Sequence, residues 1–325
     1  MLAFFRTNQQ YLNVLLLFYL AVLRASTFVH TESLSPQGHG ILSKWFFSAL
    51  PPLSIGAAIL AFFLIFVQAT LINVTVARFR VATEISLLPG VFYILLTSIV
   101  PDFLPLSSIM LANTFLILSI HNLYDAYKTS RVASRIFDAG LWLGVASLFH
   151  FPYVFLFFWG IIGLGVLRGI RIKEFFMLLI GIIVPIFLQG VYCFWIGNMT
   201  AFSEHFTQNA GILSVIPYHS STVYVKMGLI SLLLLLTVLA SSQFFSRRNM
   251  TAQKYISLLY WLMLVSGLTI LTQKALDLNQ MIILSVPLGI LLSMTFQRLT
   301  PAMAEALHIL LVMVALVFQF EYLLI

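Results

Sequence analysis

Apolar residues recur along this chain in long runs, and the polar residues gather between the runs. A helix needs about 20 apolar residues to cross a bilayer, so such runs predict membrane-spanning helices. The runs lack the polar–apolar alternation of outer-membrane barrel strands. The predicted spans are residues 10–29, 53–76, 84–100, 106–124, 136–149, 151–167, 174–197, 224–246, 254–272, 280–296 and 302–322. The pattern predicts an all-α, polytopic transmembrane helical bundle of about 11 spans, with residues 1–325 as a single integral membrane domain.

Composition supports the membrane interpretation. Hydrophobic residues make up 61% of the chain and charged residues 8%, whereas soluble domains hold about 45–50% and 25%. These values exclude a soluble enzyme and a disordered protein. The formal net charge is +7, but cationic residues in a membrane protein hold cytoplasmic loops in place, so we expect no nucleic-acid partner.

The positive residues predict the orientation of the bundle. If the N-terminus is cytoplasmic, the cytoplasmic segments contain Arg6, Arg78, Arg80, Lys128, Arg131, Arg135, Arg168, Arg171, Lys173, Arg247, Arg248, Lys254 and Arg298. The opposite side then contains only Arg24, Lys44, Lys226 and Lys274. The positive-inside rule therefore predicts a cytoplasmic N-terminus, and an odd number of spans predicts an outside C-terminus. Arg24 follows the first run where a cleavage site would need small residues, which favours an uncleaved anchor.

Two predicted outer loops, residues 30–52 and 198–223, are long enough to fold. Within the first, residues 41–50 place Ile41, Leu42, Trp45, Phe46 and Leu50 on one broad helical face. A helix of this kind suits the membrane interface. The consecutive prolines that follow it would break the helix there, so it is expected to be separate from the next span.

Two outer hairpins are expected to be short. The third span ends near Asp102, and the fifth ends near His150. The twelve residues 138–149 would make a helix of about 18 Å, shorter than the roughly 30 Å hydrocarbon core. Non-helical backbone at that depth must be buried or line a wet cavity. We therefore expect Asp102 and His150 at the floor of an outward-open cavity; the alternative is that both are solvated at a thin interface.

Ionisable side chains also gather on the predicted outer side. The histidines there are His30, His39, His150, His205 and His219, and the acids are Glu32, Asp102, Glu204, Asp277 and Glu321. Such groups perform acid–base chemistry and bind cations, so the set predicts an outer site; the alternative is that each is a solvated loop residue. Almost no ionisable residue lies near the centre of a predicted span, which argues against an ion-coupled transporter.

The sequence predicts no cofactor with certainty. No two histidines have the close spacing of a zinc site. A hard divalent cation held by Glu32 and Asp102 with water is the more plausible metal site, but the identity of any metal stays unknown. No Walker loop, dinucleotide-binding turn or nucleophile elbow is present in the sequence.

Two resemblances add to this reading. The stretch RIFDAGLWLGVASLFHFP, residues 135–152, resembles an uncharacterised polytopic membrane-protein family of Bacteroidota, which implies a multi-pass protein of the bacterial inner membrane. The topology of residues 10–197 resembles the seven-span module of GT-C glycosyltransferases, with residues 198–325 as a variable four-span part. Those enzymes have an interfacial helix in the first outer loop, then two short outer hairpins, and take sugar from a polyprenyl-phosphate carrier.

The GT-C resemblance implies specific catalytic residues. The catalytic acid of that family usually lies in the first outer loop and a second acid at the first hairpin, positions that match Glu32 and Asp102 here. This chain departs from the family pattern, because the loop holds His30-Thr-Glu32 in place of the usual Asp or acidic pair.

Transfer of sugar from such a carrier requires a base that takes the acceptor's hydroxyl proton, and Glu32 is the candidate. It also requires positive charge on the departing phosphate, for which Arg24, Lys226 and Lys274 are candidates. His150 and His219 are candidates for hydrogen bonds to sugar or phosphate. The expected partner is a membrane lipid, in the form of a polyprenyl-phosphate sugar.

Two other functions fit the sequence. A non-catalytic scaffold or assembly subunit of an envelope complex, with membrane-protein partners, agrees with the lack of a specific catalytic motif. A transporter or lipid flippase is the third. A transferase requires Glu32, Asp102 and a cation to converge, a scaffold predicts that they diverge, and a transporter predicts a polar path across the midplane.

Overall fold

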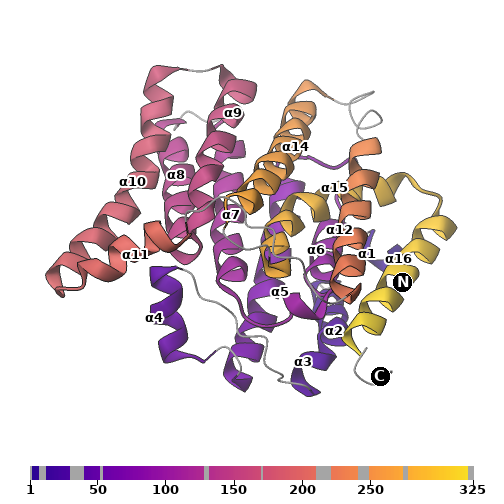
Figure 1. Cartoon of the computed structure of the whole chain (residues 1–325). Helices are drawn as coiled ribbons and strands as arrows, with labels where there is room; N and C mark the ends of the chain where they lie inside the picture. The colour runs from indigo at the N-terminus through magenta and orange to yellow at the C-terminus, as the bar shows by residue number, and fades with distance from the viewer. Residues whose placement is uncertain are drawn as a thin grey trace.

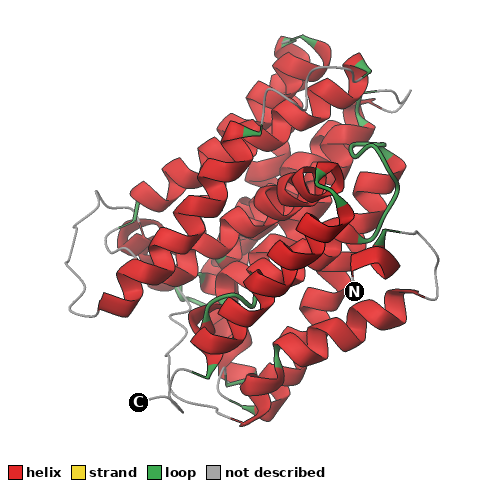
Figure 2. Ribbon diagram, turned by 90° about the vertical axis from the view of Figure 1, so that its right-hand side faces the viewer, coloured by secondary structure: helices red, strands yellow, loops and turns green. Residues whose placement is uncertain are grey.

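The computed structural model describes residues 2–6, 12–29, 40–51, 54–127, 132–169, 171–209, 221–240, 249–273 and 277–320. Helices and short connections make up all of these residues, and none of them forms a strand (Figure 2). The prediction of an all-α protein is therefore confirmed.

The helices follow one another along the chain as a bundle (Figure 1). In order they are α1 Leu2–Phe5, α2 Leu12–Leu23, α3 Ala25–Val29, α4 Ile41–Ala49, α5 Ile55–Arg78, α6 Leu88–Leu96, η1 Pro101–Phe103, α7 Ser108–Asp125, α8 Val132–Phe149, η2 Phe151–Phe155, α9 Leu156–Arg168, α10 Ile172–Trp195, α11 Met199–Asn209, α12 Ser221–Leu239, α14 Met250–Leu271, η3 Leu278–Leu284, α15 Ser285–Arg298 and α16 Pro301–Gln319. Each of the predicted spans overlaps at least one of these helices.

Membrane-length helices support the prediction of a multi-pass membrane protein. Within the described residues, seven helical segments are long and apolar enough to cross a bilayer. They are Ile55–Arg78, Val132–Phe149, Phe151–Arg168, Ile172–Trp195, Met250–Leu271, Leu278–Arg298 and Pro301–Gln319, and two shorter apolar helices are Asn13–Leu23 and Val223–Leu239. The count of about 11 spans and the orientation of the termini stay predictions.

The interior is built around α6, whose nine residues are all buried. It packs against α2, α5 and α15. Pro89 lies in its first turn, and the Thr97 hydroxyl donates to the Tyr93 carbonyl where the helix ends. At about 1.5 Å per residue, α6 is near 14 Å long and covers about half of a bilayer core.

Glycines allow α8 and α10 to approach each other closely. A Cβ atom on Gly140 would overlap the Leu178 carbonyl oxygen, and one on Gly144 would lie 2.5 Å from that of Ile182. Gly181 of α10 meets the same surface of α8. Small residues spaced four apart are a common contact between membrane helices, because they let the backbones pack directly.

The helix predicted over residues 41–50 is present as α4. It ends at Ala49, two positions before Pro51, and α5 begins separately at Ile55. Trp45 remains 69% exposed on its surface. The prediction of a helix distinct from the following span is confirmed, and its position in the membrane interface stays a prediction.

Candidate functional site

The α6–α7 and α8–α9 connections lie at one end of the bundle, at the lower side of Figure 1, which we call the hairpin end. The opposite end carries Arg78, Arg135 and Arg168, and we call it the arginine end. By the positive-inside rule the arginine end is the predicted cytoplasmic side and the hairpin end the outer side.

The first hairpin lies deeper in the bundle than the neighbouring start of α5. Gln68 of α5 bonds to Thr114 of α7, and Thr75 bonds to His121, so the two helices run side by side in the same direction and in step. With this alignment, α5 begins seven residues before α7, which is about 10 Å of helix. The setback supports the predicted cavity, which itself stays a prediction.

The helix that leads to the second hairpin is longer than expected, so this hairpin comes closer to the far side of a bilayer. Helix α8 begins at Val132 and has 18 residues, about 27 Å of helix rather than the 18 Å predicted from residues 138–149. The helix begins before the polar residue Arg135, which lay outside the predicted span 136–149.

Arg24 binds the backbone of the first hairpin. Its side chain is 1% exposed. Its guanidinium donates to the carbonyls of Leu104 at 2.8 Å, Phe103 at 3.0 Å and Thr97 at 3.1 Å. These bonds give the predicted phosphate ligand a structural role, since three of its five N–H donors are already occupied.

The same hairpin carries an ion pair between two predicted site residues. Lys226 Nζ of α12 donates to Asp102 Oδ2 of η1 at 3.2 Å. The side chains are 11% and 17% exposed, so the pair lies beneath the surface and still reaches solvent. The fold thus brings together an acid and a cation that lie 124 positions apart in the sequence.

The second hairpin carries His150, which is 3% exposed. Its Nε2 atom lies 3.2 Å from Nε2 of Gln273, just beyond the end of α14. Gln273 carries no charge and belongs to no motif, so sequence reasoning missed it. The contact sets the end of α14 against the turn that carries His150.

Two segments at the hairpin end cover the second hairpin. Gly40 lies so close to Leu148 and Phe149 that a Cβ atom on it would overlap their carbonyl oxygens. The Ser43 hydroxyl of α4 donates to the Phe149 carbonyl at 2.6 Å. From α11, the His205 ring packs edge-on against Phe151, with ring centroids 5.6 Å apart.

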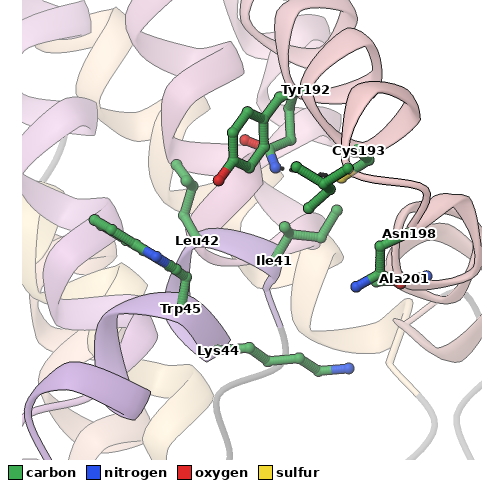
Figure 3. A pocket seen from close by; sticks show the side chains of 10 residues that line it. Ile41, Leu42, Lys44, Trp45, Tyr192, Cys193, Asn198 and Ala201 are labelled. Atoms are coloured by element: carbon green, nitrogen blue, oxygen red, sulfur yellow. Dashed lines mark hydrogen bonds between the residues drawn. The ribbon is translucent and has the colours of Figure 1, made fainter.

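A groove of about 490 Å³ lies between α4, the end of α10 and the start of α11. Its walls are mostly apolar, and Figure 3 shows Trp45 and Leu42 on the left, Tyr192 at the top, Asn198 on the right and Lys44 below. Lys44 also pairs with Glu204 of α11 at 3.7 Å. Exposed aromatic residues typically mark the membrane interface, so the groove is suited to an apolar lipid chain.

Three predicted site residues, Glu32, His219 and Lys274, lie outside the described residues. Their roles stay predictions. Within the described part of the chain, no three His, Cys, Asp or Glu side chains are grouped closely enough to hold a metal ion. The divalent cation predicted between Glu32 and Asp102 is not tested by this, because one of its ligands is not described.

Mid-depth polar side chains bond to one another and were not predicted as a group. The Tyr93 hydroxyl donates to Gln68 at 2.6 Å, and the Tyr153 hydroxyl donates to Asn113 at the same distance. All four side chains are buried. Because they satisfy each other and carry no charge, they fit a packed interior better than a permeation path.

No protein-family model, curated protein or solved structure matches this chain.

Proposed function

We propose that this protein is a GT-C-like glycosyltransferase that moves a sugar from a polyprenyl-phosphate carrier to an acceptor on the outer face of the bacterial inner membrane. The observation that carries the proposal is the Asp102–Lys226 pair at the set-back first hairpin. A partly buried cation held by a carboxylate is suited to a departing phosphate, because electrostatic stabilisation is strong where water is scarce.

In the proposed reaction, the bond between the sugar's anomeric carbon and the phosphate oxygen breaks, and a bond from that carbon to the acceptor oxygen forms. The phosphate leaves with the electron pair, and Lys226 faces the charge that develops on it. The acceptor's hydroxyl proton goes to a carboxylate, for which Glu32 remains the predicted base. Asp102 orients the Lys226 ammonium group through their ion pair.

The groove between α4 and α10 supports the same proposal at the lipid end of the substrate. Its volume of about 490 Å³ and apolar walls suit part of an isoprenoid chain. Its aromatic rim suits the headgroup region of a bilayer. The carrier's tail would lie there while its phosphate is near the hairpins.

The test is native mass spectrometry of the purified protein with polyprenyl phosphate and with uncharged polyprenol. Lys226→Gln should lower retention of polyprenyl phosphate roughly tenfold, since a hydrogen bond to a charged group contributes about 1.5–3 kcal/mol. Retention of polyprenol should not change. Lys173→Gln makes the same chemical change at an exposed position of the arginine end and serves as the control.

Equal retention of the phosphate by wild type and Lys226→Gln would overturn the assignment of Lys226. No preference of the wild type for polyprenyl phosphate over ordinary phospholipid would overturn the transferase proposal. Glu32→Gln should leave retention intact and abolish transfer of sugar in membranes supplied with labelled carrier.

A non-catalytic assembly subunit is the second candidate. The observation that favours it is the exposure of α10 and α16. In the most apolar 18-residue stretch of each helix, only 17% of the residues are buried within this chain, and the exposed residues are mostly apolar. A subunit of this kind would retain no carrier and would co-purify with membrane partners.

A further inference from the structure

A separate cavity of about 560 Å³ lies at the arginine end, at the opposite end of the helices from the hairpins. Its lining residues are Arg78, Phe79, Arg80, Tyr124, Asp125, Arg135, Thr251 and Tyr255. Three arginines thus face one carboxylate. A cavity with this imbalance attracts anions, because its cationic charge exceeds what the protein itself neutralises.

Asp125 fixes two of the guanidinium groups in place. Its Oδ1 atom lies 3.0 Å from Arg78, and its Oδ2 atom lies 2.8 Å from Arg135. Arg135 also donates to Asn122 at 3.1 Å. A single carboxylate neutralises only one of the two arginines, and both remain partly exposed, with 52% and 38% of their side chains accessible.

Arg80 occupies a backbone position that favours glycine. Beyond the end of α5, Val81 N–H donates to the Val76 carbonyl and Arg80 N–H donates to that of Ala77, which is a Schellman motif. Its left-handed residue is normally glycine, yet here Arg80 has φ +50°. Among the described residues, the exposed Arg80 guanidinium has no hydrogen-bond or ion-pair partner. Backbone strain of this kind is typical of functional positions.

The floor of the cavity is rigid and aromatic. Tyr124 and Tyr255 lie with ring centroids 4.5 Å apart, and each hydroxyl donates to the other's carbonyl. Phe79 packs edge-on against both rings. On the rim, Thr251 belongs to the first turn of α14, where free N–H groups add positive potential to that of the arginines.

We propose that this cavity binds a phosphate group, carried either by a lipid headgroup or by a small soluble phosphate ester. Guanidinium groups match phosphate oxygens in geometry and bind them with pairs of charge-assisted hydrogen bonds. Arg80 supplies the free donor, and Asp125 holds Arg78 and Arg135 in position beside it. The site lies at the other end of the bundle from the proposed transferase site and stands independently of it.

The experiment uses the full chain in nanodiscs of phosphatidylcholine and has two arms. In one, inorganic phosphate is titrated and followed by ³¹P NMR line broadening. In the other, nanodiscs that also contain phosphatidic acid are analysed by native mass spectrometry for retained lipid. Arg80→Gln should lower binding at least tenfold in whichever arm shows it, and that arm identifies the source of the phosphate.

Arg171→Gln is the matched control, because Arg171 is exposed at the same end of the bundle and lies outside the cavity. It should bind as the wild type does. Equal loss in Arg80→Gln and Arg171→Gln would overturn the proposal, because the arginines would then act only as general positive charge. Absence of binding by the wild type in both arms would overturn it as well. Arg80→Gly tests folding: it should lose binding while its unfolding midpoint equals or exceeds that of the wild type.

Discussion

Arg24 has the lowest exposed fraction of the described lysines and arginines, at 1%. A buried cation is tolerated when hydrogen bonds replace its lost water. The two terminal nitrogens of this guanidinium donate to three backbone carbonyls in the connection between α6 and α7, whereas its Nε has no hydrogen-bond partner among the described residues. Those carbonyls have no helical partner, because the chain there is too short and irregular to provide one. Arg24 therefore substitutes for the missing backbone hydrogen bonds of the first hairpin.

Replacement of this side chain should destabilise the protein. Arg24→Leu leaves three buried carbonyls without a donor, and each such group costs about 1–3 kcal/mol, so we expect a loss of several kcal/mol. The measurement is the thermal unfolding midpoint in detergent, with Lys173→Gln at an exposed position of the arginine end as the control. A variant that unfolds at the wild-type temperature and loses only carrier binding would show that Arg24 is a phosphate ligand instead.

The sequence identified individual residues better than their partners. Arg24, Asp102, Lys226 and His150 were all named from charge and position. Their contacts were not predictable, because Asp102 meets Lys226 across 124 positions and His150 meets Gln273 across 123. An uncharged glutamine carries no signal in the sequence until the fold sets it beside a histidine.

At the scale of helices, long apolar runs made the existence of the helices predictable. The observed ends differ from the predicted ones because local backbone chemistry determines where a helix begins and ends. The span predicted over 84–100 contains a helix only at Leu88–Leu96, since Pro89 lies in its first turn and Thr97 ends it. The span predicted from residue 136 begins instead at Val132, because a helix tolerates exposed polar residues in its first turns. Hydropathy could not indicate which helices pack together.

The α8–α10 contact gives a prediction at this scale. A Cβ atom on Gly144 would lie 2.5 Å from a backbone oxygen of the facing helix, so Gly144→Ala must push the helices apart. Overpacking of this kind typically costs about 1–3 kcal/mol. Gly228→Ala in α12 is the control, because nothing lies within 4 Å of its added Cβ atom. We expect a lower unfolding midpoint for Gly144→Ala alone; equal midpoints would mean that the contact does not limit stability.

The whole molecule has two chemically different ends. The hairpin end combines the Asp102–Lys226 pair with an apolar groove, and the arginine end combines a cationic cavity with an aromatic floor. Between them lies a core whose polar side chains are buried and bonded to one another. The transferase proposal therefore depends on which end faces the cytoplasm, and so does the set of ligands that the cationic cavity meets.

Cysteine accessibility tests that orientation. In a Cys193→Ala background, which removes the chain's one cysteine, Glu204→Cys introduces a label site at the hairpin end and Lys173→Cys introduces one at the arginine end. The positive-inside rule predicts that a membrane-impermeant maleimide labels the Glu204 site in spheroplasts and the Lys173 site only after the membrane is opened. The reverse pattern would show that the hairpin end faces the cytoplasm, where a transferase of the outer face could not act. The phosphate cavity would then face outward and meet a different set of ligands, although its arginines would bind the same chemical group.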